Sequence, residues 1–168
     1  SKGAATAARQ IKEMQIQVPI IAMTHCEAAK VISKFGSSSN GYLCPTQWAE
    51  TLSYSDNLFG SASTYDLLFK GTYEGYKNVP YQAAQASAAV MVWKDAFERA
   101  NSFDTAKVRD ALAATNMSTF YGNIKFSSAG NNIAKPMVLR QIQNGKLNVV
   151  APSKWASHPV QYPRKVKY

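Results

Sequence analysis

Apolar residues recur at helical and strand spacings through the first 46 residues of the chain. Residues 3–15 carry apolar side chains three and four positions apart, which predicts an amphipathic helix. Its apolar face would consist of Ala7, Ala8, Ile11 and Met14. The apolar run at 20–23 is typical of a buried parallel strand. Residues 27–35 again have helical spacing, and residues 42–44 form a second short strand that Pro45 should stop. The order helix, strand, helix, strand predicts half of a doubly wound α/β sheet.

Helical patterns dominate the middle of the chain. Residues 63–73 form one helix, and a second begins after Pro80 and continues to about residue 101. The first half of this long helix is small and apolar on every side, so we expect it to be buried against a close neighbour. Asp104 can accept hydrogen bonds from the free amides of a further helix over residues 105–114.

The last third of the chain has strand-like spacing. Residues 121–126 alternate loosely, and residues 137–142 form an apolar run of strand length. Asn144-Gly145 is the strongest hairpin signal in the sequence, and it leads into a further apolar run at 147–150. We therefore predict a β-hairpin in this region.

Composition indicates a folded chain with a positive surface. Of the 168 residues, 46% are apolar and 17% are charged, so a packed core is expected and general disorder is not. No stretch approaches the roughly 18 uninterrupted apolar residues of a spanning helix. Nineteen basic and ten acidic side chains leave a net charge of +9, which suggests anionic partners.

The basic residues are spread along the sequence, and only residues 164–167 form a cluster. A nucleic-acid-binding surface usually combines a basic face with stacking aromatic side chains, and the sequence does not show that pattern. We therefore expect a solvated surface with a loose basic tail, and no nucleic-acid partner.

The sequence lacks the common signatures of catalysis. Its two histidines, His25 and His158, are more than a hundred positions apart, and neither belongs to a cluster with metal-ligand spacing. There is no G-x-S-x-G nucleophile elbow and no phosphate-binding loop. His25 is adjacent to Cys26, but adjacent side chains rarely face each other, so a catalytic Cys–His pair is not favoured. We expect a protein that is not an enzyme and that uses neither a metal nor a cofactor.

Three segments stand in a characteristic order. They are Y-x-A-A-x-A-x-A-A from Tyr81, V-R-D-A-L at 108–112, and F-Y-G-x-I-x-F-x-x-x-G at 120–130. Together with the helices and strands before them, they resemble the C-terminal half of a type I periplasmic solute-binding protein. The resemblance is to the branched-chain amino acid (Leu/Ile/Val) family of ABC importers, and it covers residues 3–152.

This resemblance implies an α/β fold with two lobes joined by a hinge, each lobe a parallel Rossmann-like sheet flanked by helices. Only the C-terminal part of that fold would be present. The implied ranges are part of the C-terminal lobe (1–46), a hinge crossing (47–60), part of the N-terminal lobe (61–132), a return to the C-terminal lobe (133–152) and a C-terminal tail (153–168).

The chain begins with Ser1-Lys2-Gly3, without an initiator Met or an apolar signal segment, which fits a processed protein or a piece of a longer one. The resemblance implies that the N-terminal half of the protein is missing. We expect that half to exist as a separate, cleaved chain held non-covalently, because this chain alone would expose apolar faces.

The function that the resemblance implies is solute capture in the bacterial periplasm, after export. The protein would hold an amino acid or a small organic carboxylate between its lobes and present it to ABC permease subunits in the membrane. The alternative is a ligand-sensing regulatory or receptor domain of the same fold.

Ligands of open α/β sheets bind beyond the carboxyl ends of the strands, which here places Met23, Thr24 and His25 at the ligand. Members of the family that bind amino acids have a carboxylate in this loop against the ligand's ammonium. Thr24 occupies that position and Glu27 is the nearest acid, which favours an aromatic or other organic carboxylate over an α-amino acid. The alternative is that Thr24 and His25 only cap the helix that begins near Cys26.

Two aromatic residues are further ligand-binding candidates. Tyr81 aligns with an aromatic residue that lines the family's pocket, and Trp48 follows the second strand, where an indole could stack on an aromatic ligand. For each residue the alternative is a packing role, in the hinge for Tyr81 and in the core or between the lobes for Trp48.

Cys26 and Cys44 lie at the carboxyl ends of what should be adjacent parallel strands, about 5 Å apart. A disulfide between them is geometrically feasible, and the expected periplasmic location would permit it. The alternative is two buried free thiols, because both positions also read as apolar core.

Overall fold

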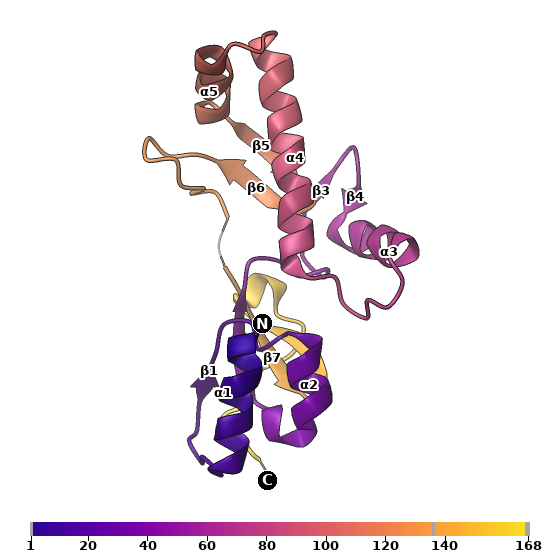
Figure 1. The fold of residues 1–168 in the computed structure, drawn as a ribbon, viewed down its shortest axis with the longest axis vertical. Helices are drawn as coiled ribbons and strands as arrows, with labels where there is room; N and C mark the ends of the chain where they lie inside the picture. The colour runs from indigo at the N-terminus through magenta and orange to yellow at the C-terminus, as the bar shows by residue number, and fades with distance from the viewer. Residues whose placement is uncertain (1, 136, 167–168) are drawn as a thin grey trace. The chain divides into compact units, whose positions relative to one another are not determined.

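The computed structural model describes residues 2–135 and 137–166, and the chain forms two compact units (Figure 1). Unit 1 consists of Ser1–Ala49 and Met137–Tyr168, and unit 2 is the continuous segment Glu50–Pro136. Each unit combines helices with strands, which confirms the α/β class. Within the described residues, no helix has the length and apolar character needed to cross a membrane.

Unit 1 is built on a four-stranded mixed sheet in the order β1-β2-β7-β8. β1 and β2 are parallel, while β7 is antiparallel to both of its neighbours, β2 and β8. The strands are β1 (Ile21–Ala22), β2 (Tyr42–Thr46), β7 (Val138–Gln143) and β8 (Lys146–Ala151), and the helices are α1 (Lys2–Glu13), α2 (Ala29–Phe35) and the 3-10 turns η1 (Gly36–Ser39) and η2 (Ser153–Trp155).

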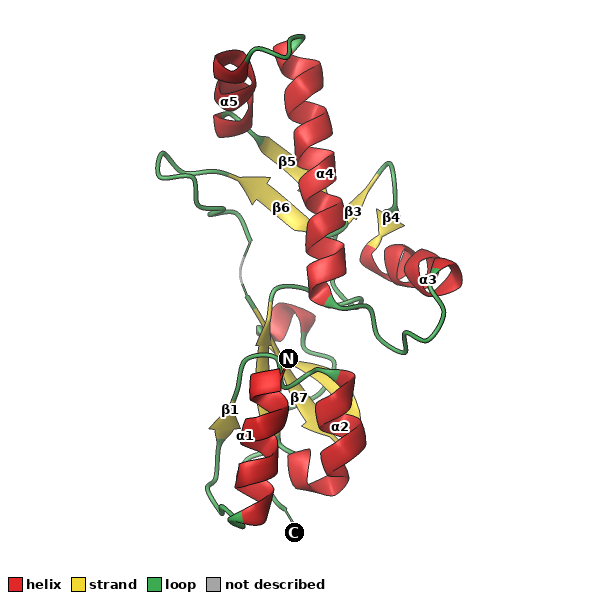
Figure 2. Cartoon of the chain, viewed as in Figure 1, coloured by secondary structure: helices red, strands yellow, loops and turns green. Residues whose placement is uncertain are grey.

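Helices α1 and α2 cover one face of this sheet (Figure 2). Small side chains on α1 allow the helix to approach closely, and the central strands contribute larger ones. The buried members of this core are Ala4, Ala8, Cys26, Val31, Tyr42, Cys44 and Ile142.

The predicted elements of unit 1 are present, with corrections at their edges. The N-terminal helix ends at Glu13, so Met14 is not part of its apolar face and is 71% exposed. The first strand is an edge strand of two residues, and Ile20 before it is 53% exposed, because only β2 pairs with it. The prediction of a buried strand at 20–23 is therefore wrong.

Pro45 lies inside β2 instead of ending it. The Met23 amide donates to the Leu43 carbonyl (2.9 Å), so Leu43 directs its backbone groups toward β1. Pro45, two residues further along, directs its nitrogen to the same side, past the end of β1, where no partner strand needs an N–H. The missing donor therefore costs no hydrogen bond of the sheet.

The predicted hairpin is confirmed. Asn144 and Gly145 connect β7 to β8 with φ of 52° and 74°, the left-handed values that a two-residue type I′ turn requires.

The C-terminal segment is not the loose tail that we expected. It crosses the sheet face opposite the helices, where Gln141 exchanges hydrogen bonds with the backbone of Gln161 (2.8 and 3.0 Å) and Gln143 donates to the Pro159 carbonyl (2.9 Å). Arg164 in the basic cluster is only 8% exposed. Its guanidinium donates to the carbonyls of Ser38 (2.9 Å) and Asn40 (3.1 Å).

Unit 2 contains three helices and two small antiparallel hairpins among the residues that the structure describes. The predicted helices are confirmed, and the Asp104 side chain caps the last of them by accepting from the Lys107 amide (3.0 Å). The elements are β3 (Ser55–Asp56), β4 (Gly60–Ser61), α3 (Ala62–Thr72), α4 (Tyr81–Ala100), α5 (Thr105–Ala113), β5 (Asn116–Thr119) and β6 (Gly122–Lys125).

A cluster of aromatic rings and one carboxylate tie the first hairpin of unit 2 to the second. Tyr65 and Phe120 stack with ring centroids 3.9 Å apart, and Phe59 contacts both rings edge-on. The carboxylate of Asp56 accepts from the Phe120 amide (2.6 Å) and from the amides of its own turn. Segments about sixty residues apart are thereby joined.

Helix α4 is buried along one face only, where small residues lie four positions apart. The buried residues are Ala84, Ala88, Val92 and Ala96. The opposite side carries Val90, which is 68% exposed. The expectation that the first half of this helix is buried on every side is therefore wrong for the chain as it stands.

Candidate functional site

The loop after β1 carries three of the predicted ligand-binding residues, and backbone contacts define its shape. The Met23 amide is bound to β2, the Cys26 amide approaches the Met23 carbonyl (3.4 Å), and His25 adopts a left-handed φ of 62°. Thr24 is exposed, while Met23 and His25 are partly exposed. All three residues are therefore accessible at the carboxyl end of the first strand.

The capping alternative for Thr24 and His25 is not what the structure shows. Helix α2 begins at Ala29, later than expected, and its N-cap residue is Ala28, which makes no side-chain capping hydrogen bond. Thr24 and His25 precede the helix by several residues, so neither side chain is the N-cap of its first turn.

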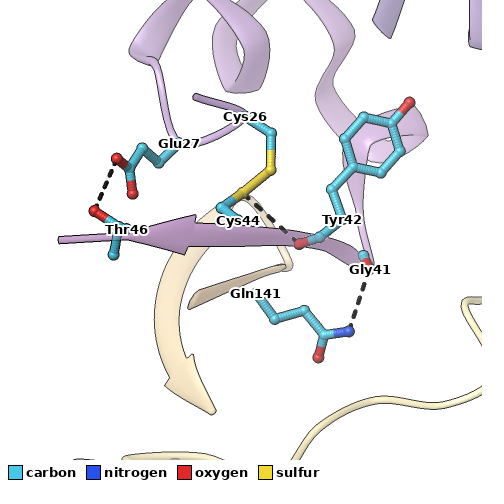
Figure 3. The surroundings of a disulfide bond; sticks show 7 residues. All are labelled: Cys26, Glu27, Gly41, Tyr42, Cys44, Thr46 and Gln141. Atoms are coloured by element: carbon cyan, nitrogen blue, oxygen red, sulfur yellow. Dashed lines mark hydrogen bonds between the residues drawn. A yellow bond between two sulfur atoms is a disulfide. The ribbon is translucent and has the colours of Figure 1, made fainter. Parts of the chain in front are cut away.

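Cys26 and Cys44 form a disulfide, with their Cα atoms 5.4 Å apart (Figure 3). The structure thus has the bridge and not the two free thiols. Both residues are fully buried and belong to the core of unit 1. The bond covalently attaches the loop after β1 to β2, which limits how far the neighbouring Thr24 and His25 can move.

An acidic side chain lies at the same end of the sheet. The Thr46 hydroxyl donates to the Glu27 carboxylate (3.0 Å), so that the last residue of β2 holds the acid in place (Figure 3). Glu27 was not among the predicted site residues. The signal that could have identified it is its position one residue after the cysteine, at the carboxyl end of two neighbouring strands.

Trp48 follows β2 and is 1% exposed. An indole with so little accessible surface cannot offer its face to a ligand in this conformation. Its burial favours the packing role over ligand stacking.

The fifth predicted residue, Tyr81, is the first residue of α4 and belongs to unit 2, unlike the other four. It is partly exposed. Tyr121, in the turn between β5 and β6, lies close enough that a charge on Tyr81 raises its pKa. Burial is the larger cause, and together the two effects raise the pKa of Tyr121 to about 12.

Lys135 completes this group of side chains. Its ammonium lies 4.2 Å from the centroid of the Tyr121 ring, a cation–π contact, and burial lowers the pKa of Lys135 to about 8. Its stem packs on Gly122, where an added Cβ would meet the Lys135 Cε atom at 2.6 Å. Neither Tyr121 nor Lys135 was predicted as a site residue, although Tyr121 and Gly122 belong to the characteristic segment at 120–130.

Unit 2 also has an apolar groove of about 540 Å³ between α4, α5 and β6. None of the five predicted ligand-binding residues lines this groove, although Tyr121 does. The apolar residues that line it include Ala88, Val92, Trp93, Leu112, Ile124 and Phe126. Within the described part of the chain, no group of three or more His, Cys, Asp or Glu side chains could hold a metal ion.

Comparison with known proteins gives consistent matches. A model of the periplasmic binding protein family matches residues 1–146. A leucine-binding protein, LivK from Thermotoga maritima, is 26% identical with a TM-score of 0.74, over 89% of this chain and 41% of that one. The branched-chain amino acid transporter substrate-binding protein LivJ from Streptococcus pneumoniae, in complex with isoleucine, is 18% identical with a TM-score of 0.71 over 89% and 42%.

A third similar structure is an ABC transporter substrate-binding protein from Desulfitobacterium hafniense in complex with leucine. It is 17% identical with a TM-score of 0.63, over 88% of this chain and 40% of that one. The chain therefore spans about two-fifths of the length of the structures it matches.

Proposed function

Because the chain belongs to the periplasmic binding protein family and has part of its type I α/β fold, we propose that the protein is the substrate-binding component of an ABC importer. The observation that carries the proposal is the family match over residues 1–146 together with 26% identity to a leucine-binding protein over 89% of the chain. In this proposal the protein works outside the cytoplasm, in the periplasm, and delivers its ligand to permease subunits in the membrane.

The ligand that we propose is an aliphatic α-amino acid. The similar structures are named for leucine or contain leucine or isoleucine, and none of them supports the aromatic carboxylate that Thr24 suggested. Glu27 supplies the acid that this position lacks, since Thr46 holds its carboxylate beside the same loop. A carboxylate there can accept hydrogen bonds from the ligand's ammonium.

The residues that we assign to the ligand include four that the sequence suggested. Thr24 and His25 can donate hydrogen bonds, and Met23 can pack against an aliphatic side chain. Tyr81 can contribute an aromatic face and a hydroxyl. Trp48 we assign to packing, because its indole is buried.

Capture of a solute requires only that the ligand bind one conformation more tightly than another. A ligand that binds one conformation more tightly shifts the population toward that conformation, which the permease can then recognise. No bond is made or broken in such a cycle. The Cys26–Cys44 bridge would keep the loop of unit 1 in one shape throughout.

Thermal unfolding of the complete protein with a ligand panel tests the proposal. The panel holds L-leucine, L-isoleucine, L-valine, benzoate and 4-hydroxybenzoate, with D-leucine as the matched control. A ligand at 100 times its Kd should stabilise the protein by about 2.7 kcal/mol. We expect this shift with an aliphatic L-amino acid and not with D-leucine. A shift with the aromatic acids alone would overturn the ligand assignment, and no shift with any compound would overturn solute binding.

A further inference from the structure

The net charge of +9 belongs entirely to unit 1. This unit carries eleven of the nineteen basic side chains and only two of the ten acidic ones, whereas unit 2 carries eight of each. Of the two acids in unit 1, Glu27 lies at the carboxyl ends of β1 and β2, and Glu13 pairs with Arg9 (3.4 Å). The positive charge of unit 1 is therefore largely uncompensated, and the proposed solute capture does not use it.

Four exposed lysines gather at the opposite end of unit 1, where β1 and β2 begin. Helices α1 and α2 end there because each leads into one of these strands, and the β7–β8 turn lies there because β7 is antiparallel to β2. Lys12 and Lys34, in the last turns of the two helices, both line a hollow of about 470 Å³. The surface that we call the basic end consists of these two residues with Lys146 and Lys165, and all four side chains are exposed.

Asn40, between η1 and β2, brings the other two lysines to the same end. Its side-chain oxygen accepts from the amide of Gly145, the residue before Lys146 (3.3 Å). Its carbonyl accepts from the guanidinium of Arg164, the residue before Lys165 (3.1 Å). Among the residues that the structure describes, none of the four lysines is in an ion pair. Their charges are therefore available to an anionic partner.

Apolar side chains are exposed beside these charges. In the loop from α1 to β1, Met14 is 71% and Val18 is 40% exposed. The Arg164 amide donates to the Pro19 carbonyl (2.9 Å), which holds this loop against the segment that carries Lys165. Exposed apolar groups next to lysines are typical of proteins that bind at the lipid–water interface, since burial of the apolar groups adds to the attraction of anionic lipids. Interfaces between proteins, in contrast, are depleted in lysine.

From this arrangement we propose that the basic end of unit 1 binds the surface of a membrane that contains anionic phospholipids. The four ammonium groups contact the phosphate headgroups, and Met14 and Val18 enter the boundary between headgroups and acyl chains. Lysine is a flexible point charge, and four lysines on different segments suit a diffuse negative surface better than a single phosphate held in fixed geometry. The loop that carries Thr24 is at the other end of the sheet, so this contact leaves it accessible. The proposal does not depend on which solute the protein captures.

Co-sedimentation of the complete protein with lipid vesicles tests the charged part of the contact. Phosphatidylcholine vesicles with roughly 30% phosphatidylglycerol should bind the protein at about 50 mM salt, and vesicles of phosphatidylcholine alone should not. Each lysine near an anionic surface contributes about fivefold to binding, so replacing all four by glutamine should weaken it by roughly 100- to 600-fold. The matched control removes the same charge from exposed positions of unit 2 and should weaken binding by less than about fivefold. Its substitutions are Lys77→Gln, Lys94→Gln, Lys107→Gln and Lys125→Gln.

A separate variant tests the apolar part of the contact. Met14→Ser together with Val18→Ser should weaken binding to the anionic vesicles by at least about fivefold, because two apolar side chains no longer leave water. Both positions are exposed, so the substitutions remove no core contact. Raising the salt to about 0.5 M should weaken binding of the unaltered protein by at least about tenfold, because added ions screen the lysine charges.

Acetylation of the unaltered protein gives a result that does not depend on how the variants fold. Anionic vesicles should slow the reaction of the four lysines of the basic end with an N-hydroxysuccinimide ester severalfold, measured by mass spectrometry, and should leave the four control lysines unchanged. Failure to bind anionic vesicles, equal protection of the two sets, or equal losses in the two lysine variants would overturn the proposal. Unchanged binding in the Met14 and Val18 variant, or tighter binding to a DNA duplex than to the vesicles, would overturn it as well.

Discussion

Replacing Arg164 by methionine tests how much the C-terminal segment contributes to the stability of unit 1. The substitution keeps most of the stem, which packs on Gly41, and removes the guanidinium. The guanidinium donates to the carbonyls of Ser38 and Asn40 at 2.9 and 3.1 Å and lies 5.0 Å from the centre of the Tyr42 ring. Ser38 and Asn40 belong to the segment that connects α2 to β2, and Tyr42 is the first residue of β2.

The expected loss follows from these contacts. A hydrogen bond from a charged donor contributes about 1.5–3 kcal/mol, and two short ones are lost in Arg164→Met. The release of a buried charge into water offsets part of that loss. We therefore expect the free energy of unfolding of unit 1 to fall by about 2–4 kcal/mol.

Urea denaturation measures this change, and Lys165→Met is the matched control because Lys165 is the exposed neighbour. With a urea dependence of about 1–3 kcal/mol per M, Arg164→Met should lower the midpoint by roughly 1–2 M, while the control should change stability by less than about 0.5 kcal/mol. Amide exchange of residues 36–42 should accelerate in Arg164→Met alone. Equal effects of the two substitutions would show that the burial of Arg164 contributes nothing specific.

Three other predictions follow from particular contacts. The double substitution Cys26→Ala with Cys44→Ala should lower the free energy of unfolding by about 3 kcal/mol, since the bridge joins residues 18 positions apart, and an unchanged melting temperature would contradict this. Gly122→Ala should destabilise unit 2 by about 1–3 kcal/mol, because φ is 145° and the new Cβ would collide with the Lys135 stem. Gly71→Ala, in the open surface of α3, should instead stabilise unit 2 by about 0.5–1 kcal/mol. Urea denaturation of both variants measures these changes, and equal effects would contradict the prediction. The pKa of Lys135 is about 8 when folded and 10.5 in an unfolded chain, so the unfolded state binds more protons between these values. The stability of the unaltered protein relative to Lys135→Met should therefore rise from pH 8 to 10.5, and a flat or falling difference in pH-dependent melts would contradict the burial of its charge.

The candidate site could be predicted in part. The loop of Met23, Thr24 and His25 was predicted because ligands of α/β sheets bind at the carboxyl ends of the strands. Glu27 was noted only as the nearest acid, since its fixed position depends on Thr46 from another strand. The burial of Lys135 could not be predicted, because its environment is made by Tyr121 and Gly122 and nothing in its local sequence distinguishes it from an exposed lysine.

The sequence by itself determined those features that depend on neighbours a few positions away. The helix over Tyr81–Ala100, the Asp104 cap and the Asn144-Gly145 turn all follow from local spacing and backbone preference, and all three are present. The family resemblance could also be read from the order of such local segments.

Tertiary structure alone decided which surfaces are buried and which distant groups meet. Pro45 continues β2 because β1 has already ended, Arg164 is buried because the last residues return to Ser38 and Asn40, and Cys26 meets Cys44 because two strands pair in register. Local spacing specifies which side of a helix or strand is apolar. The residues that cover that side come from segments far away in the chain, and the packing of the whole unit determines where those segments lie.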